Sequence, residues 1–162
     1  MIDITGWYQS RPDYRLEQIL DRPGRLVFLD RPRHLGNIGA VIRVAAAAGA
    51  AGVLTTGDRN PWDAGALRGS AGLHFAIPVA RVDRLPDTLR SMVAVHPDGD
   101  VLGTTPIPDD AILAFGSERQ GLVQALLDSA DARVAIRMAP GVSSLNLATS
   151  VAVILYSAES AE

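Results

Sequence analysis

The sequence contains no cysteine, which excludes disulfide bonds, thiol chemistry and a cysteine-ligated zinc site. Only three histidines are present, and none has a partner at helical metal-ligand spacing, so we expect no metal site. No apolar run approaches the roughly 18 residues that a membrane-spanning helix needs. The first residues also lack the basic-then-apolar order of a signal peptide. These absences together predict a soluble, cytoplasmic protein.

Lysine is also absent, so all 15 basic residues are arginine. The 162 residues carry a formal net charge of −3, which argues against a general polyanion binder. Twelve of the arginines nevertheless lie in residues 1–90, and local arginine clusters can still bind phosphate groups. A hydrophobic fraction of 48% is enough for a buried core, which excludes a disordered tail and predicts a single domain over residues 1–162.

Apolar runs alternate with helix-like stretches along the chain. This alternation predicts an α/β domain, a mostly parallel sheet flanked by helices. Ligands of such sheets bind beyond the carboxyl ends of the strands, so the loops to search are residues 31–37, 96–100, 116–121 and 139–144. The predicted strands are residues 25–30, 52–56, 75–82, 92–96, 112–116 and 133–138, and the predicted helices are residues 37–48, 64–70, 86–91, 122–129 and 145–158.

Residues 1–24 form an N-terminal extension of different composition, in which aromatic residues alternate with arginines. Such a segment can stack on bases and bind phosphate. The plainer interpretation is a short amphipathic helix, with Leu16, Ile19 and Leu20 packed on the sheet edge or on a partner subunit. Both interpretations stay open, and helix packing is the one we favour.

Three polar motifs each follow a predicted strand. The first is Asn37-Ile-Gly-Ala-Val-Ile-Arg43, in which Asn37 suits an N-cap, the central glycine permits close packing, and the arginine suits a phosphate or carboxylate. Its plain alternative is a cap followed by a solvated face. Gly49 suits the residue just after this helix. The motif is not a dinucleotide fingerprint, because the third glycine is missing.

The second motif is Gly116-Ser-Glu118-Arg-Gln-Gly121-Leu, where a glycine at a strand end lets a ligand approach the backbone. Its acid stands at a predicted helix entrance, where complementing the helix dipole is the plain alternative. The third motif is Ile136-Arg-Met138-Ala-Pro-Gly-Val142-Ser-Ser144-Leu-Asn146. Capping explains Ser144 easily. It explains Asn146 less well, because Asn146 falls inside the predicted helix.

In this order, the three motifs resemble the signature motifs of the SpoU (TrmH-like) family of RNA ribose 2′-O-methyltransferases, in the SPOUT superfamily. Residues 68–78 are similar to a further family stretch, and the resemblance covers residues 25–156. Arg119 and Arg137 depart from the family pattern, where glycine and proline are usual. Each departure is either neutral drift or an added phosphate contact.

The resemblance implies an α/β fold with a deep C-terminal trefoil knot that binds S-adenosylmethionine, and a homodimer with each active site near the subunit interface. The chain is similar to minimal members that consist of the catalytic domain alone. The implied cofactor-binding residues are Val95, His96, Gly116, Ile136, Met138, Ser144 and Leu145. The implied catalytic residues are Arg43, Asn37, Glu118, Ser144 and Asn146.

The implied substrate is tRNA or rRNA, with no DNA or membrane partner expected. The arginines that we expect to contact RNA are Arg11, Arg15, Arg31, Arg33 and Arg43. Two alternatives remain from the residues themselves: a catalytically inactive RNA-binding or assembly protein of the same fold, and a generic nucleotide-binding module such as a dehydrogenase. The joint presence of the polar motif residues argues against the first, and the missing third glycine argues against the second.

Overall fold

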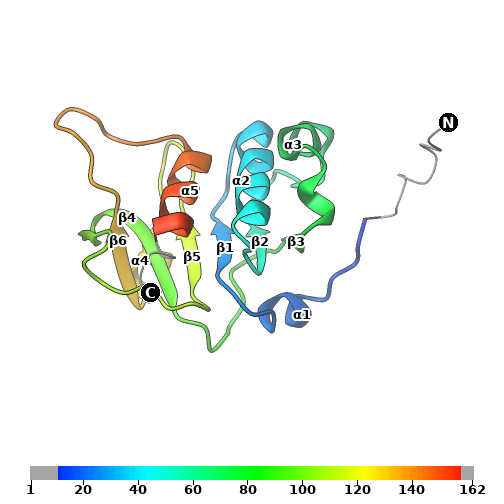
Figure 1. The fold of residues 1–162 in the computed structure, drawn as a ribbon, viewed down its shortest axis with the longest axis horizontal. Helices are drawn as coiled ribbons and strands as arrows, with labels where there is room; N and C mark the ends of the chain where they lie inside the picture. The colour runs from blue at the N-terminus through cyan, green and yellow to red at the C-terminus, as the bar shows by residue number, and fades with distance from the viewer. Residues whose placement is uncertain (1–10, 158–162) are drawn as a thin grey trace.

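The computed structural model describes residues 11–157 and contains a six-stranded, fully parallel sheet in the order β3-β2-β1-β5-β4-β6 (Figure 1). The predicted α/β class with a parallel sheet is therefore confirmed, whereas the trefoil knot stays a prediction. The strands are β1 (Leu26–Leu29), β2 (Gly52–Thr55), β3 (Val79–Arg81), β4 (Met92–Val101), β5 (Ile112–Phe115) and β6 (Ala132–Ala135).

Helices cover both faces of this sheet. Alternate strand residues point to opposite faces, and they separate into two buried clusters. One cluster joins the strands to α2, α3 and α5, with α2 and α5 side by side in Figure 1, and the other joins them to α1 and α4. Burial on both faces explains why the central strands are continuously apolar. The helices are α1 (Leu16–Leu20), α2 (Leu35–Ala47), α3 (Ala64–Ser70), the 3-10 helix η2 (Leu73–Phe75), α4 (Gln124–Ser129) and α5 (Leu147–Ser157).

The two ends of α2 compare differently with the prediction. At its end, Gly49 has a φ of +66° and donates to the carbonyl of Ala46, while Ala50 donates to that of Ala45, the two hydrogen bonds of a Schellman motif. The prediction that Gly49 lies just after the end of this helix is confirmed. At its start, His34 is the N-cap, so the predicted N-cap Asn37 was wrong and lies in the first turn instead.

Close contact between α2 and α3 depends on Gly39. A Cβ atom at this position would lie 2.2 Å from the carbonyl oxygen of Ala66 and 2.8 Å from the Cα of Gly69. The glycine therefore lets two helix backbones touch, as the sequence predicts for the first motif.

Two predicted elements were wrong, and the predicted loop at residues 96–100 lies instead within β4. Residues 75–82 were expected to be one strand, but the structure has η2 followed by β3 only at Val79–Arg81. The backbone N–H groups of Phe75 and Ala76 donate to the preceding turn, and the turn is anchored by His74, which is buried and hydrogen bonded at 2.6 Å to both the Ser70 hydroxyl and the Pro61 carbonyl. Residues 86–91 are not helical, and Arg90 there donates to the backbone carbonyls of Leu20, Gly24 and Asp110.

The amphipathic helix expected near the N-terminus is present as α1, and its Ile19 is fully buried in the cluster that joins the strands to α1 and α4. The predicted packing helix is thus confirmed. Residues 1–10, with Trp7 and Tyr8, lie outside the described residues. Within residues 11–157, no helix has the length and apolar character needed to cross a membrane.

Candidate active site

The direction in which strands are added reverses at β1, whose neighbours are β2 on one side and β5 on the other. In open parallel sheets, ligands bind outside the carboxyl ends of the strands at such a switch point. The first motif follows β1 and the second follows β5, so the two motifs meet across this point.

A pocket of about 700 Å³ opens beside the switch point, at the carboxyl ends of β5 and β6 and beside the middle of β4. It is within the size range of small-molecule sites. All seven predicted cofactor-binding residues line it, together with Glu118 and Asn146 from the predicted catalytic set. The other lining residues are Pro97, Phe115, Ser117, Gly121, Val142, Ser143, Leu147 and Ser150.

A chain of side-chain hydrogen bonds joins the three motifs. Asn37 donates from Nδ2 to Oε1 of Glu118 over 2.9 Å, and Asn146 donates from Nδ2 to Oδ1 of Asn37 over 3.1 Å. The backbone N–H of Arg33 donates to the other carboxylate oxygen of Glu118 over 3.0 Å. Three of the five predicted catalytic residues are therefore in direct contact.

Asn146 also fixes the direction of this chain. Its Oδ1 accepts the backbone N–H groups of Ala148 at 2.9 Å and Thr149 at 3.4 Å, so Asn146 is the N-cap of α5. The expectation that Asn146 lies inside the helix was wrong. Because its oxygen faces the helix, its amide nitrogen faces Asn37, whose own nitrogen must then face Glu118.

Glu118 is held as a carboxylate. Burial acts to raise the pKa of Glu118, but hydrogen bonds from Asn37, from its own backbone N–H and from Arg33, with the charge of His34, together hold that pKa below its ordinary value. The acid was expected to stand at the start of the helix after β5. It lies instead six positions before the first residue of α4, and its contacts are with Asn37 in the first turn of α2 and with Arg33 just before it.

Gly116 is required for a reason that the sequence did not indicate. A Cβ atom there would lie 2.0 Å from the carbonyl carbon of Gly121 and 2.1 Å from the nitrogen of Leu122. Ser117 and Gly121 exchange backbone hydrogen bonds of 3.2 and 3.0 Å, which close the loop back on itself. The glycine thus admits the loop's own backbone and shapes the pocket wall indirectly.

The other two predicted catalytic residues lie apart from the hydrogen-bonded chain. Ser144 is exposed and lines the pocket. Arg43 is exposed on α2 and lies outside the pocket lining. It lies six positions after Asn37 in the helix, about 9 Å along the axis and about 120° around it. Among residues 11–157, Arg43 makes no hydrogen bond or ion pair, and no group of three or more potential ligands is arranged to hold a metal.

The remaining arginines expected to contact RNA have different surroundings. The side chains of Arg15 and Arg33 are exposed, and the guanidinium of Arg11 lies 5.6 Å from the ring centroid of Trp62. Arg31 instead contacts Asp30, with Nε 3.2 Å from Oδ1 and Nη2 3.3 Å from Oδ2.

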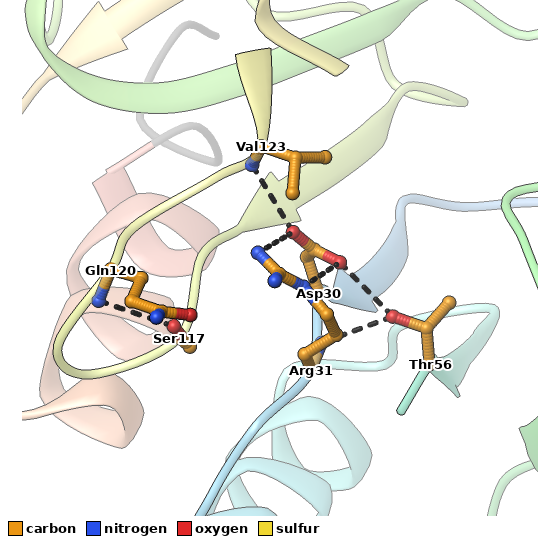
Figure 2. Close-up of polar contacts among 6 residues, drawn as sticks. All are labelled: Asp30, Arg31, Thr56, Ser117, Gln120 and Val123. Atoms are coloured by element: carbon orange, nitrogen blue, oxygen red, sulfur yellow. Dashed lines mark hydrogen bonds and ion pairs between the residues drawn. The ribbon is translucent and has the colours of Figure 1, made fainter. Parts of the chain in front are cut away.

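Asp30 is a residue that sequence reasoning missed. It is buried directly after β1, and Figure 2 shows its carboxylate facing Arg31, Thr56 and Val123. It accepts the Thr56 hydroxyl at 3.1 Å and the Val123 N–H at 3.2 Å. The available signal was an acid and a hydroxyl residue directly after two neighbouring buried strands. Asp30 joins the loop after β1 to the end of the loop that carries Glu118.

Arg31 has a left-handed backbone, with φ of +50°. This conformation costs a residue other than glycine about 1–2 kcal/mol. It is held by the Arg31 N–H, which donates to the Thr56 hydroxyl over 3.0 Å. Gly57 makes room for it, because a Cβ there would lie 3.0 Å from the Arg31 Cα.

Known proteins resemble this chain in sequence and in fold. An uncharacterised tRNA/rRNA methyltransferase of Synechocystis sp. is 35% identical over 161 residues, covering 94% of this chain and 56% of that protein. A 23S rRNA (adenosine(1067)-2′-O)-methyltransferase of Streptomyces azureus is 31% identical over 154 residues, covering 88% of this chain and 56% of that protein. The crystal structure of the SpoU methyltransferase AviRb from Streptomyces viridochromogenes, in complex with AdoMet, matches with a TM-score of 0.82 at 32% identity and covers 91% of this chain and 64% of that one.

The chain spans just over half the length of these two curated relatives. Within the chain itself, the family match is nearly complete, because residues 24–156 match the model of the SpoU rRNA Methylase family. That range includes all three polar motifs and the whole pocket lining. This chain belongs to the SpoU rRNA Methylase family.

Proposed function

We propose that this protein transfers a methyl group from S-adenosylmethionine to a ribose 2′-hydroxyl of tRNA or rRNA. The observation that carries the proposal is the chain of hydrogen bonds from Asn146 through Asn37 to Glu118 at the rim of the pocket. The relatives support it, since they are named as tRNA/rRNA and 23S rRNA 2′-O methyltransferases, and AviRb binds AdoMet.

The pocket suits S-adenosylmethionine in size and chemistry. Apolar side chains such as Val95, Ile136 and Leu145 offer surfaces for an adenine ring, and Ser143 and Ser144 offer hydroxyls for polar groups. When bound, this cofactor supplies an electrophilic methyl group on a sulfonium. The residues that we propose to hold it are Val95, His96, Gly116, Ile136, Met138, Ser144 and Leu145.

The protein's own task is to orient a weakly nucleophilic hydroxyl. Both oxygens of Glu118 already accept hydrogen bonds, so its proposed role is to fix Asn37 and the loop before α2. Methyl transfer would join the methyl carbon to the ribose oxygen as the carbon–sulfur bond of the sulfonium breaks, leaving a neutral thioether, and the hydroxyl proton would pass to solvent. We assign this site positioning and electrostatic stabilisation, because a guanidinium such as that of Arg43 carries hydrogen-bond donors and no acceptor and stabilises negative charge.

The proposal includes a homodimer and a cytoplasmic location. Arg43 supports the proposed dimer, because its side chain is exposed and lies outside the pocket lining of its own chain. Each active site lies near the proposed subunit interface, where this guanidinium can act with a phosphate of the RNA.

Methyl transfer from radiolabelled S-adenosylmethionine to bulk RNA tests the proposal, with Arg43→Ala as the informative variant. We expect label in RNA with the wild type, and loss of label with R43A while cofactor affinity stays within a few-fold. NAD serves as the control ligand in the cofactor titration. Binding of NAD in place of S-adenosylmethionine would support the dehydrogenase alternative, and cofactor binding without transfer to any RNA would support the inactive RNA-binding alternative.

A further inference from the structure

The pair formed by Asp30 and Arg31 has features of a prepared anion site. The side chain of Asp30 is only 6% exposed, whereas that of Arg31 is 41% exposed, so one partner is buried and the other reaches solvent. The carboxylate holds the Nε–Nη2 edge of the guanidinium at 3.2 and 3.3 Å. In Figure 2 the carboxylate is also fixed from its other sides by Thr56 and Val123.

The guanidinium keeps unused hydrogen-bond donors. It has five N–H groups, and the contacts with Asp30 use two of them. The Nη1 group makes no hydrogen bond or ion pair with any residue in the range 11–157. The remaining edge offers the paired N–H groups that bind a phosphate in bidentate fashion, and its orientation is already set before binding.

The backbone at Arg31 supports a functional interpretation. Glycine adopts the left-handed conformation without strain, yet the chain places an arginine there and holds it with Thr56. Backbone strain of this kind, held in place by the surrounding residues, is a recurring feature of functional sites.

Arg31 also lies close to the proposed reaction. The backbone N–H of Arg33, two residues later, contacts Glu118, and two residues span at most about 7 Å. Asp30 holds Val123, which ends the loop that contains Glu118. The same carboxylate therefore ties the guanidinium to the pocket wall.

We propose that Arg31, oriented by Asp30, binds one backbone phosphate of the RNA beside the pocket. Asp30 is then a positioning residue, since it acts through Arg31. This inference rests on the proposed function and deepens it, because it assigns one phosphate contact to one pre-oriented side chain.

The test compares Arg31→Gly with Arg84→Gly. Glycine keeps the left-handed backbone at position 31, so R31G removes the guanidinium without new strain. Arg84 is 76% exposed in another loop, and within the described part of the chain it pairs only with Asp87 at 3.6 Å, so R84G is the matched loss of one charge. RNA affinity is measured at several salt concentrations, alongside cofactor affinity and methyl transfer.

We expect R31G to bind RNA about tenfold more weakly, with a salt dependence reduced by about one phosphate contact and cofactor affinity unchanged. R84G stays within about twofold of the wild type in RNA affinity. We expect Asp30→Asn to weaken RNA binding when it is made in the wild type, but to cause little further loss of RNA affinity when it is made in R31G. Such non-additivity distinguishes a role of Asp30 in orienting Arg31 from a general structural role.

Three results would contradict the inference, each at a different point. If the wild type transfers methyl groups to RNA but R31G keeps the same RNA affinity and salt dependence as the wild type, the phosphate contact is contradicted and the proposed function still stands. A wild-type protein that binds no RNA at any salt concentration contradicts both. Equal effects of D30N in the wild-type and R31G backgrounds would contradict the positioning role of Asp30.

Discussion

Asn146 donates a hydrogen bond to Asn37 over 3.1 Å, although 109 positions separate the two residues in the chain. Each asparagine has both its amide nitrogen and its oxygen engaged, Asn146 with α5 and Asn37 with Glu118. A network in which every member is satisfied has one favoured arrangement, because reversing one amide leaves its neighbours unpaired. The network thus sets the geometry of the three motifs together.

Asn37→Ala removes the central member of this network. We expect methyl transfer to fall about 100-fold, because Glu118 and Asn146 lose their common partner and the site loses its alignment. Asn37→Asp keeps the shape and the acceptor for Asn146 but places a second carboxylate against Glu118, so it lowers activity at least as much. Single-turnover rates with saturating cofactor measure both variants. Full activity in N37A would contradict the claim that this hydrogen-bonded network aligns the site.

Glu118 gives the folding stability a defined acid dependence. Its pKa is lower in the folded protein than the ordinary 4.5. The ionised form therefore contributes stability above about pH 4.5, and this contribution disappears as the pH falls through the folded-state value. We expect the difference in unfolding free energy between the wild type and Glu118→Gln to be largest near pH 7 and to shrink as the pH is lowered below 4.5. Urea titrations at each pH measure it, and a constant difference would contradict the assignment.

Two glycines of α2 provide a matched pair of stability tests. Gly39→Ala forces a Cβ into the backbone of α3, and we expect it to destabilise the protein by about 1–3 kcal/mol. Gly36→Ala meets no atom within 4 Å, and we expect a gain of up to about 1 kcal/mol from better helix propensity. Thermal and urea unfolding compare them. Similar effects of the two changes would mean that α2 and α3 do not touch at Gly39.

Gly116→Ala tests how the pocket wall is built. Its Cβ collides with Gly121 and Leu122, so the loop must open and the pocket must change shape. We expect weaker S-adenosylmethionine binding together with a lower melting temperature. Calorimetric titration and thermal unfolding give the two values, with G36A as the control for the same substitution elsewhere. Wild-type cofactor affinity in G116A would show that the loop does not form the wall.

The sheet and most helices could be predicted because their signal is local. The stripe of Ile38, Val41, Ile42 and Ala45 indicates α2, and Gly49 marks its end. Predictions failed where a side chain competes with the local pattern. His74 draws its segment into η2 through contacts with Ser70 and Pro61, which the sequence pattern alone does not reveal.

The site was predictable in its members but not in its connections. The motifs placed Asn37, Glu118 and Asn146 together through the family resemblance, yet their hydrogen bonds span 81 and 109 positions, and local periodicity carries no such information. The role of Asp30 was missed for the same reason, since its partners Thr56 and Val123 come from other strands and loops.

The most direct test of the central claim is the chemical position of the methyl group. After transfer from labelled S-adenosylmethionine, the RNA is digested to nucleosides and the labelled product is identified. We expect label in a 2′-O-methylated nucleoside, absent from the R43A reaction and reduced about 100-fold in the N37A reaction. Label on a base, or equal label with R43A and N37A, would contradict the account.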